Sequence, residues 1–122
     1  MLILETVGLG IILNSPDPAR LFTFYPDVVG LPMRPEMGEH ALDAGGVGLT
    51  FDSHDQVAGI AREPARILLN LFVSDIVAER QRMEGDGVVF IRKEGVEPWG
   101  GIISTFLDAD GSYVQLIQFN PS

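Results

Sequence analysis

The chain has 122 residues, with 17 acidic against 8 basic side chains and a net charge of −9 at pH 7. This acidity argues against a nucleic-acid partner, because contact with phosphates needs a basic surface. Cysteine is absent, which excludes disulfides and thiolate chemistry. No apolar run approaches the ~20 residues of a membrane span, and the first residues lack the basic segment of a signal peptide. We therefore expect a cytoplasmic protein without a membrane partner.

The first half of the chain predicts a strand, a helix and three short strands. Residues 7–14 are apolar and β-branched, as is typical of a strand. Asp17-Pro18 predicts a helix start, since an acid caps the helix and proline suits its first position. An apolar stripe over residues 21–29 continues this helix, and Pro26 should kink or interrupt it. The three short strands are expected at residues 31–36, 40–44 and 47–52.

The second half repeats this order after a polar linker over residues 53–65. Asp75 should cap a helix that runs to about Glu84, and Asp110-Gly111 favours a tight turn between the last two strands. Strands are expected at residues 66–73, 88–92, 102–107 and 113–119, with a loop over residues 93–101.

An internal repeat connects the two halves. Gly10-Ile-Ile-Leu-Asn-Ser-Pro-Asp17 and Leu68-Leu-Asn-Leu-Phe-Val-Ser-Asp75 are both apolar runs that lead to a helix-capping acid. Such self-similarity predicts one domain made of two similar βαβββ halves, about residues 7–52 and 66–119.

Three motifs within these halves resemble a known superfamily. They are Phe24-Tyr25-x-Asp27-Val-x-Gly30-Leu31, Glu97-Pro-Trp-Gly100 and Phe106-x-Asp108-x-Asp110-Gly111. Together they resemble the vicinal oxygen chelate superfamily, which includes glyoxalase I, extradiol dioxygenases and bleomycin-resistance proteins. The Pro-Trp-Gly element looks most like the antibiotic-binding branch. The resemblance implies an α+β fold of paired βαβββ modules in a curved mixed sheet, and a homodimer.

The resemblance also implies where metal ligands would lie. Metal enzymes of the superfamily use histidine near the start of a half's first strand and glutamate near the end of its last strand. Here the histidine positions hold Gly10 and Leu68, and the glutamate positions hold Gln115 in the second half and Gly48 or Thr50 in the first. None of these residues offers an imidazole or a carboxylate to a metal. We therefore expect no metal, no cofactor and no assignable catalytic residue.

The two histidines leave one alternative open. A compensating metal site of His54, Asp52 and Gln115 is conceivable, but nothing in the spacing forces these residues to converge. We interpret His40 and His54 as solvated surface residues.

The candidate ligand-binding residues come from the inward face that strand alternation predicts. Neutral amides and aromatic rings in an apolar cavity are typical of a small-molecule pocket, and burying unneeded amides would be costly. Trp99, between Pro98 and two glycines, is suited to stack on a planar or cationic ligand. It is equally consistent with an interface or core position, and Phe24 and Tyr25 are expected to pack in the core. The predicted ligand-binding set is Asn14, Asn70, Phe72, Trp99, Tyr113 and Gln115.

These observations favour a protein that binds a small, partly apolar molecule without metal, for sequestration or resistance. One alternative is a glyoxalase-like lyase or dioxygenase with displaced ligands. Another is a non-catalytic, partner-binding protein whose cavity is filled by its own side chains. The sequence leaves open whether the site lies within one chain or at a dimer interface.

Overall fold

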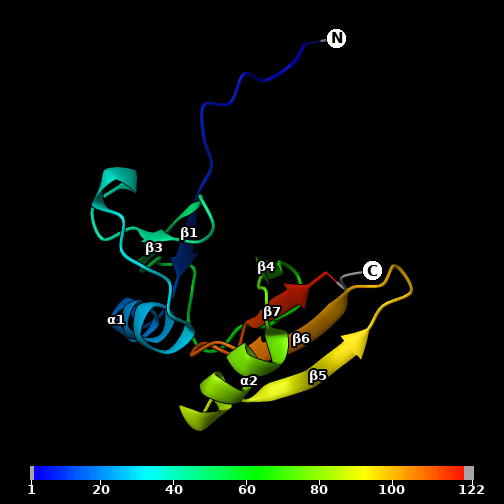
Figure 1. Ribbon diagram of the computed structural model, residues 1–122. Coiled ribbons are helices and arrows are strands. Elements are labelled where there is room, and N and C mark those ends of the chain that lie inside the picture. The colour runs from blue at the N-terminus through cyan, green and yellow to red at the C-terminus, as the bar shows by residue number, and fades with distance from the viewer. Residues whose placement is uncertain (1, 120–122) are drawn as a thin grey trace. The chain divides into compact units, whose positions relative to one another are not determined.

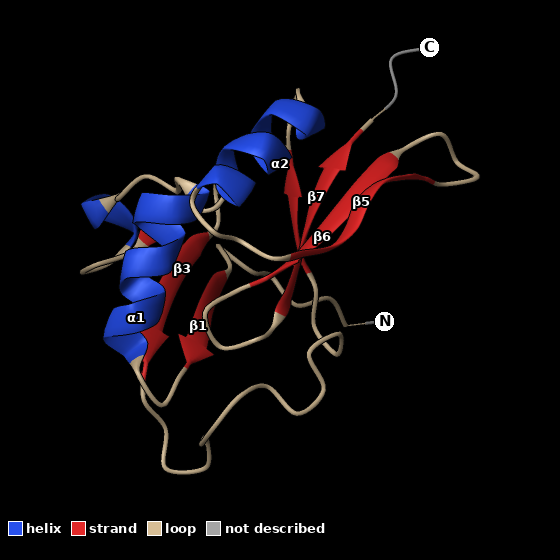
Figure 2. Cartoon of the chain, turned by 90° about the horizontal axis from the view of Figure 1, so that it is seen from below, coloured by secondary structure: helices blue, strands red, loops and turns tan. Residues whose placement is uncertain are grey.

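Each half of the chain forms a small mixed sheet in which the first and last strands pair in parallel, and a helix follows the first strand (Figures 1 and 2). The computed structural model describes residues 2–119. Contacts between residues divide the chain into two compact units, the first ending at Ala58 and the second beginning at Gly59. This division lies inside the predicted linker.

The first unit holds a three-stranded sheet in the order β1-β3-β2. Strands β1 and β3 are parallel, and β2 is antiparallel to β3. In chain order its elements are β1 (Gly10–Asn14), α1 (Pro18–Thr23), the π-helical turn η1 (Phe24–Val29), the 3₁₀ turn η2 (Pro35–Met37), β2 (Leu42–Asp43) and β3 (Gly48–Asp52).

The predicted helix start and its interruption are both confirmed. Asp17 caps α1 by accepting a hydrogen bond from the N–H of Arg20 at 3.3 Å. The α-helix ends at Thr23, and the chain widens into the π-helical turn that contains Pro26. Proline has no N–H to donate and its ring displaces the carbonyl one turn earlier, so a regular α-helix cannot continue.

Two strand predictions in the first unit are wrong. Residues 31–36 form no strand, because Pro32 and Pro35 have no N–H to donate to a ladder; only Met33 makes an isolated bridge, to Leu42. The first strand starts at Gly10 instead of residue 7, because its partner strand begins at Gly48, directly opposite.

The second unit has the same topology with one more full strand, in the order β4-β7-β6-β5. Strands β4 and β7 are parallel, and the other pairs are antiparallel. Asp75 caps the helix as predicted, accepting from the N–H of Ala78 at 3.1 Å. The elements are β4 (Leu69–Phe72), α2 (Ile76–Gly85), β5 (Phe90–Val96), β6 (Ile102–Leu107) and β7 (Tyr113–Gln118).

Strand β5 corrects the predicted loop over residues 93–101, since it continues to Val96. Its pairing with β6 shifts register between Phe90 and Arg92 and again between Arg92 and Gly95. Glu94, at a φ of 42°, donates its N–H to the buried Ser104 Oγ at 2.9 Å. A bulge of this kind lets a strand continue while its side chains change face. Strand β4 is shorter than the predicted 66–73.

The helix-facing side of each sheet supplies most of the buried core, and Ile103 and Ile117 of the second unit add to it from the opposite face. In the first unit Tyr25 is fully buried, as predicted, whereas Phe24 is only half-buried. In the second unit α2 lies across β5, β6 and β7 (Figure 1). The largest buried side chains there are Ile76, Met83, Phe106, Val114 and Leu116. Among residues 2–119, no helix is long and apolar enough to cross a membrane.

Candidate functional site

The sheet of the second unit has one face covered by α2 and an opposite face that we call the open face. Residues in register on neighbouring strands project from the same face. One row of the open face is formed by Asn70, Gln115 and Thr105. The next row is formed by Phe72, Ile117 and Ile103. Thr105, Ile117 and Ile103 are buried, so the exposed part of this face is its β4 side, with Asn70 and Phe72.

An aromatic cluster of Phe72, Phe119 and Trp99 stands on the open face. The rings of Phe72 and Phe119 are stacked, with centroids 5.4 Å apart and an interplanar angle of 6°. Trp99 meets Phe119 edge-to-face at 5.9 Å and 61°. Although the three rings contact one another, they remain 63%, 65% and 55% exposed for Phe72, Phe119 and Trp99. Exposed aromatic rings in contact with one another are typical of interaction sites, so this cluster is a candidate.

Neutral amides lie one row away from the aromatic cluster. Gln115 donates its Nε2 hydrogen to Thr105 Oγ1 at 3.4 Å. The exposed side chain of Asn70 has no hydrogen-bond partner among residues 2–119, and no bond joins it to Gln115. The amides therefore do not satisfy each other, and that of Asn70 can donate to and accept from a ligand.

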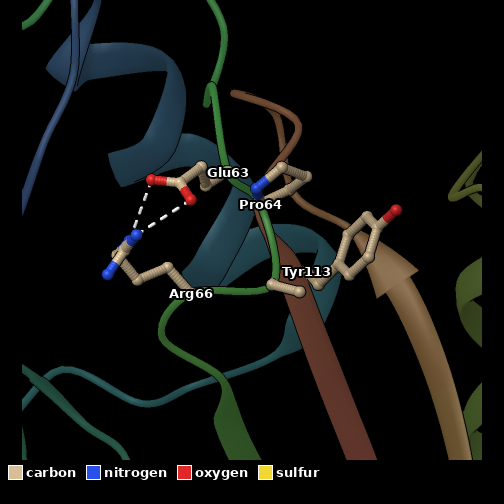
Figure 3. A pocket seen from close by; sticks show the side chains of 5 residues that line it. Glu63, Pro64, Arg66 and Tyr113 are labelled. Carbon is tan, nitrogen blue, oxygen red and sulfur yellow. Dashed lines mark hydrogen bonds and ion pairs between the residues drawn. The ribbon is translucent and has the colours of Figure 1, made fainter.

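Tyr113 stands at the far end of β7. Its six-residue separation from Phe119 corresponds to about 20 Å along a strand. It lines an open pocket of about 400 Å³ with four residues of the linker region, Glu63, Pro64, Ala65 and Arg66. Figure 3 shows Arg66 turned toward Glu63, with Nη2–Oε1 and Nε–Oε2 distances of 2.8 and 3.0 Å, and Tyr113 on the side of Pro64. The structure thus separates Tyr113 from the aromatic cluster.

Of the six predicted ligand-binding residues, the structure brings four together on the open face: Asn70, Phe72, Trp99 and Gln115. Asn14 belongs to the first unit, where it is exposed and ends β1 in register with Asp52.

Phe119 and Arg92 are the open-face residues that sequence reasoning missed. Alternation along the last strand, from Gln115 through Ile117, is the signal that could have found Phe119. Arg92 is in register with Thr105 and donates from Nη1 to Glu97 Oε1 at 2.7 Å. No sequence pattern indicates that pair, because it depends on the bulge in β5.

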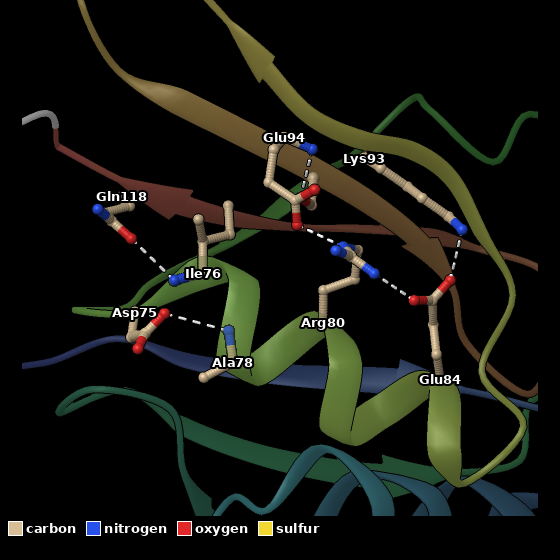
Figure 4. A network of polar contacts seen from close by, with 9 residues as sticks. Asp75, Ile76, Ala78, Arg80, Glu84, Lys93, Glu94 and Gln118 are labelled. Carbon is tan, nitrogen blue, oxygen red and sulfur yellow. Dashed lines mark hydrogen bonds and ion pairs between the residues drawn. The ribbon is translucent and has the colours of Figure 1, made fainter.

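The same bulge sends Glu94 to the opposite face of the sheet. There Arg80 of α2 donates to both Glu94 and Glu84, and Lys93 Nζ lies 2.8 Å from Glu84 Oε2 (Figure 4). The hydrogen bond to Glu94 raises the pKa of Arg80. Hydrogen bonds from Lys93 and, to a lesser extent, from Arg80 lower the pKa of Glu84. Glu94 is therefore engaged in holding α2 against β5, and Glu97 is the carboxylate nearer Trp99.

The donor set at the positions implied by the resemblance does not fit a metal. Gly10 and Leu68 have no donor atom, and Gln115 is bonded to Thr105 as described. Within residues 2–119, no group of three or more histidine, cysteine, aspartate or glutamate side chains is placed to hold a metal ion.

The two histidines have local partners. His54 Nδ1 accepts from the N–H of Gln56 at 3.1 Å, and Asp52 Oδ1 accepts from the N–H of Ser53 at 2.8 Å. The side chains of His40 and His54 are 69% and 47% exposed, consistent with surface residues.

Comparison with known proteins places the chain in a family. A family model described as Glyoxalase/Bleomycin resistance protein/Dioxygenase superfamily matches residues 7–116. The chain belongs to this superfamily. No curated protein sequence matches it significantly.

Solved structures share the fold of this chain. TnmS3, an antibiotic binding protein from Streptomyces sp. CB03234, is 22% identical with a TM-score of 0.70, over 98% of this chain and 99% of that one. TioX from Micromonospora sp. ML1 is 21% identical with a TM-score of 0.66, over 93% and 99%. A superfamily member from Sphaerobacter thermophilus DSM 20745 is 16% identical with a TM-score of 0.72, over 93% and 97%. At these identities the likeness establishes the α+β fold of the superfamily.

Proposed function

We propose that this superfamily member binds a small, planar and partly apolar molecule on the open face of its second unit, without a metal, in a sequestering or resistance role. The observation that carries this proposal is the exposed aromatic cluster of Phe72, Phe119 and Trp99. A flat ligand that covers about 100 Å² of exposed ring surface would gain about 2.5 kcal/mol from apolar burial alone.

The amides beside the cluster would supply orientation. Asn70 offers a donor and an acceptor, and the side-chain oxygen of Gln115 offers a second acceptor. A few polar groups next to apolar and aromatic surface is the usual composition of a small-molecule site. The polar edge of a flat ligand would lie over these amides while its apolar body covers the rings.

Charge favours a neutral or cationic ligand over an anion. Residues 59–119 carry nine acidic side chains against six basic ones. Their field raises the local concentration of cations and weakens with salt. TnmS3, an antibiotic binding protein with the same fold, supports a small-molecule role. The ligand of this chain would be set by its own open face.

Titration with two matched flat dyes tests the proposal. Proflavine is a planar cation at pH 8 and acridine is a neutral ring system of similar shape. We expect both to bind saturably, with quenching of Trp99, the only tryptophan, and only proflavine to lose affinity in 0.5 M salt. If neither dye binds a folded sample at millimolar concentration, the proposed function is wrong.

Metal content separates binding without metal from the enzyme alternative. We expect the purified protein to contain no stoichiometric Zn, Ni, Fe or Mn, because Gly10, Leu68 and Gln115 stand at the implied ligand positions. One tightly held equivalent per chain, lost on His54→Ala or Asp52→Ala, would establish the compensating metal site instead.

We also propose that the protein is a homodimer, as members of this superfamily usually are. Exposed apolar side chains in both units, such as Ile12 at 60% and Val96 at 70%, are available to pair across a two-fold axis. Light scattering should give about twice the chain mass of 13.3 kDa. A monomer at all concentrations would exclude a site shared between two copies.

A further inference from the structure

Two glycines of the second unit lie directly beneath large side chains. A methyl group added to Gly101 would overlap the six-membered ring of the Trp99 indole, and one added to Gly95 would overlap the guanidinium of Arg92. Gly101 is buried although Trp99 itself is 55% exposed, and the outer atoms of the six-membered indole ring lie where a side chain at Gly101 would begin.

The backbone does not explain these glycines. Neither Gly95 nor Gly101 has a positive φ, so an L-residue could adopt either conformation. Gly100 differs, because its φ of 92° lies in the left-handed region that favours glycine. Of the two glycines after Trp99, the first serves the turn, and the second leaves room for the indole.

Both covered glycines belong to the open face. Gly95 is in register with Ile103, which belongs to the row of Phe72. Gly101 comes just before Ile102, whose partner is Gln118, and is therefore level with Phe119. Room over Gly101 brings the indole against Phe119, and room over Gly95 lets Arg92 reach Glu97.

We propose that Gly101 and Gly95 are positioning residues of the open face, which leave room for the Trp99 indole and the Arg92 guanidinium to lie close against the sheet, so that the surface can receive a planar ligand. This inference rests on the proposed function for its ligand, but the side-chain positions can be measured without one. Gly101 would contribute to binding through Trp99 alone, since the indole covers it.

Gly101→Ala tests the proposal with Trp99 as its own reporter. We expect the free variant to show a red-shifted and less anisotropic Trp99 emission, because the displaced indole leaves Phe119 for water. Proflavine affinity should fall about tenfold, equivalent to about 1.4 kcal/mol. The melting temperature should change little, since the overlap is with an exposed side chain that can swing away.

A double-mutant cycle separates positioning from a structural role. If Gly101 acts only through the indole, then Trp99→Ala and Trp99→Ala/Gly101→Ala should bind proflavine equally. The control is Gly85→Ala, at the end of α2, where an added methyl meets nothing within 4 Å; its affinity and emission should match the wild type. A second cycle compares the proflavine affinity of Arg92→Ala with that of Arg92→Ala/Gly95→Ala, and the two should again be equal.

Each outcome decides the proposal. Unchanged Trp99 emission in Gly101→Ala, or additive effects in the cycle, would overturn it. If Gly101→Ala fails to fold, recovery of folding in Trp99→Ala/Gly101→Ala would support the overlap, and failure of both would contradict it. If no dye binds the wild type, the proposed function fails. The Trp99 emission of the free variants then shows by itself whether Gly101 positions the indole.

Discussion

The two units share a topology but differ on the sheet face opposite their helices. In the first unit the parallel pair β1 and β3 presents Gly10, Ile12 and Asn14 beside Gly48, Thr50 and Asp52. In the second unit the equivalent pair β4 and β7 presents Asn70 and Phe72 beside Gln115 and Ile117. Backbone pairing needs only strands in register, so the repeat preserves the fold while the side chains on one face diverge.

This difference locates the candidate chemistry. The rows of the first unit's face carry two glycines, Ile12, Asn14, Thr50 and Asp52 and no aromatic residue. The second unit's face carries stacked rings beside the amides of Asn70 and Gln115. When a fold is repeated within one chain, both copies can keep the topology while only one carries the side chains suited to binding. The experiments below compare residues of the two faces, or of the two units, in matched pairs.

The largest effect is expected in the core, where Phe106 is fully buried under α2. Phe106→Ala should destabilise the protein by about 3–5 kcal/mol, because it removes a large ring from a packed site. Urea unfolding would measure this loss. If the free energy of unfolding falls no more than on replacing an exposed aromatic residue, the helix-covered face is not the core.

Trp99→Ala should leave the fold intact and remove most of the dye affinity. The indole is 55% exposed and contacts Phe119 at its edge, so we expect a stability change within about 1 kcal/mol. Proflavine affinity should fall by about tenfold or more, as calorimetry would show. If Trp99→Ala unfolds the protein, the tryptophan is a core residue and the binding hypothesis fails.

The smallest effect should come from the two asparagines on these faces, Asn14 at the end of β1 and Asn70 within β4. Asn70→Leu removes the free amide beside the aromatic cluster and should alter the preference between dyes by about threefold to tenfold. Asn14→Leu, the matched change in the first unit, should leave that preference unchanged. Marked stabilisation by Asn70→Leu together with unchanged dye preference would indicate a filled surface instead of a binding one.

Local signals determined much of the fold. Asp17 and Asp75 cap helices, and Pro26 ends one, through interactions with residues close in sequence. Such effects depend on short-range sterics and hydrogen bonds, so a sequence pattern is sufficient to predict them. The prolines that abolish the strand at residues 31–36 act just as locally, and the apolar pattern of that segment obscured them.

The sequence by itself therefore determined the two halves, their helix starts and the common face of Asn70, Phe72 and Gln115, since strand alternation has a period of two. Only the tertiary structure decided the rest of the open face. The bulge at Glu94 separates that carboxylate from Arg92, and the fold of residues 97–101 lays Trp99 over Gly101 and against Phe119. The contacts of Glu94 with Ser104 and of Trp99 with Phe119 join separate segments of the chain through the register of paired strands, which no local pattern specifies.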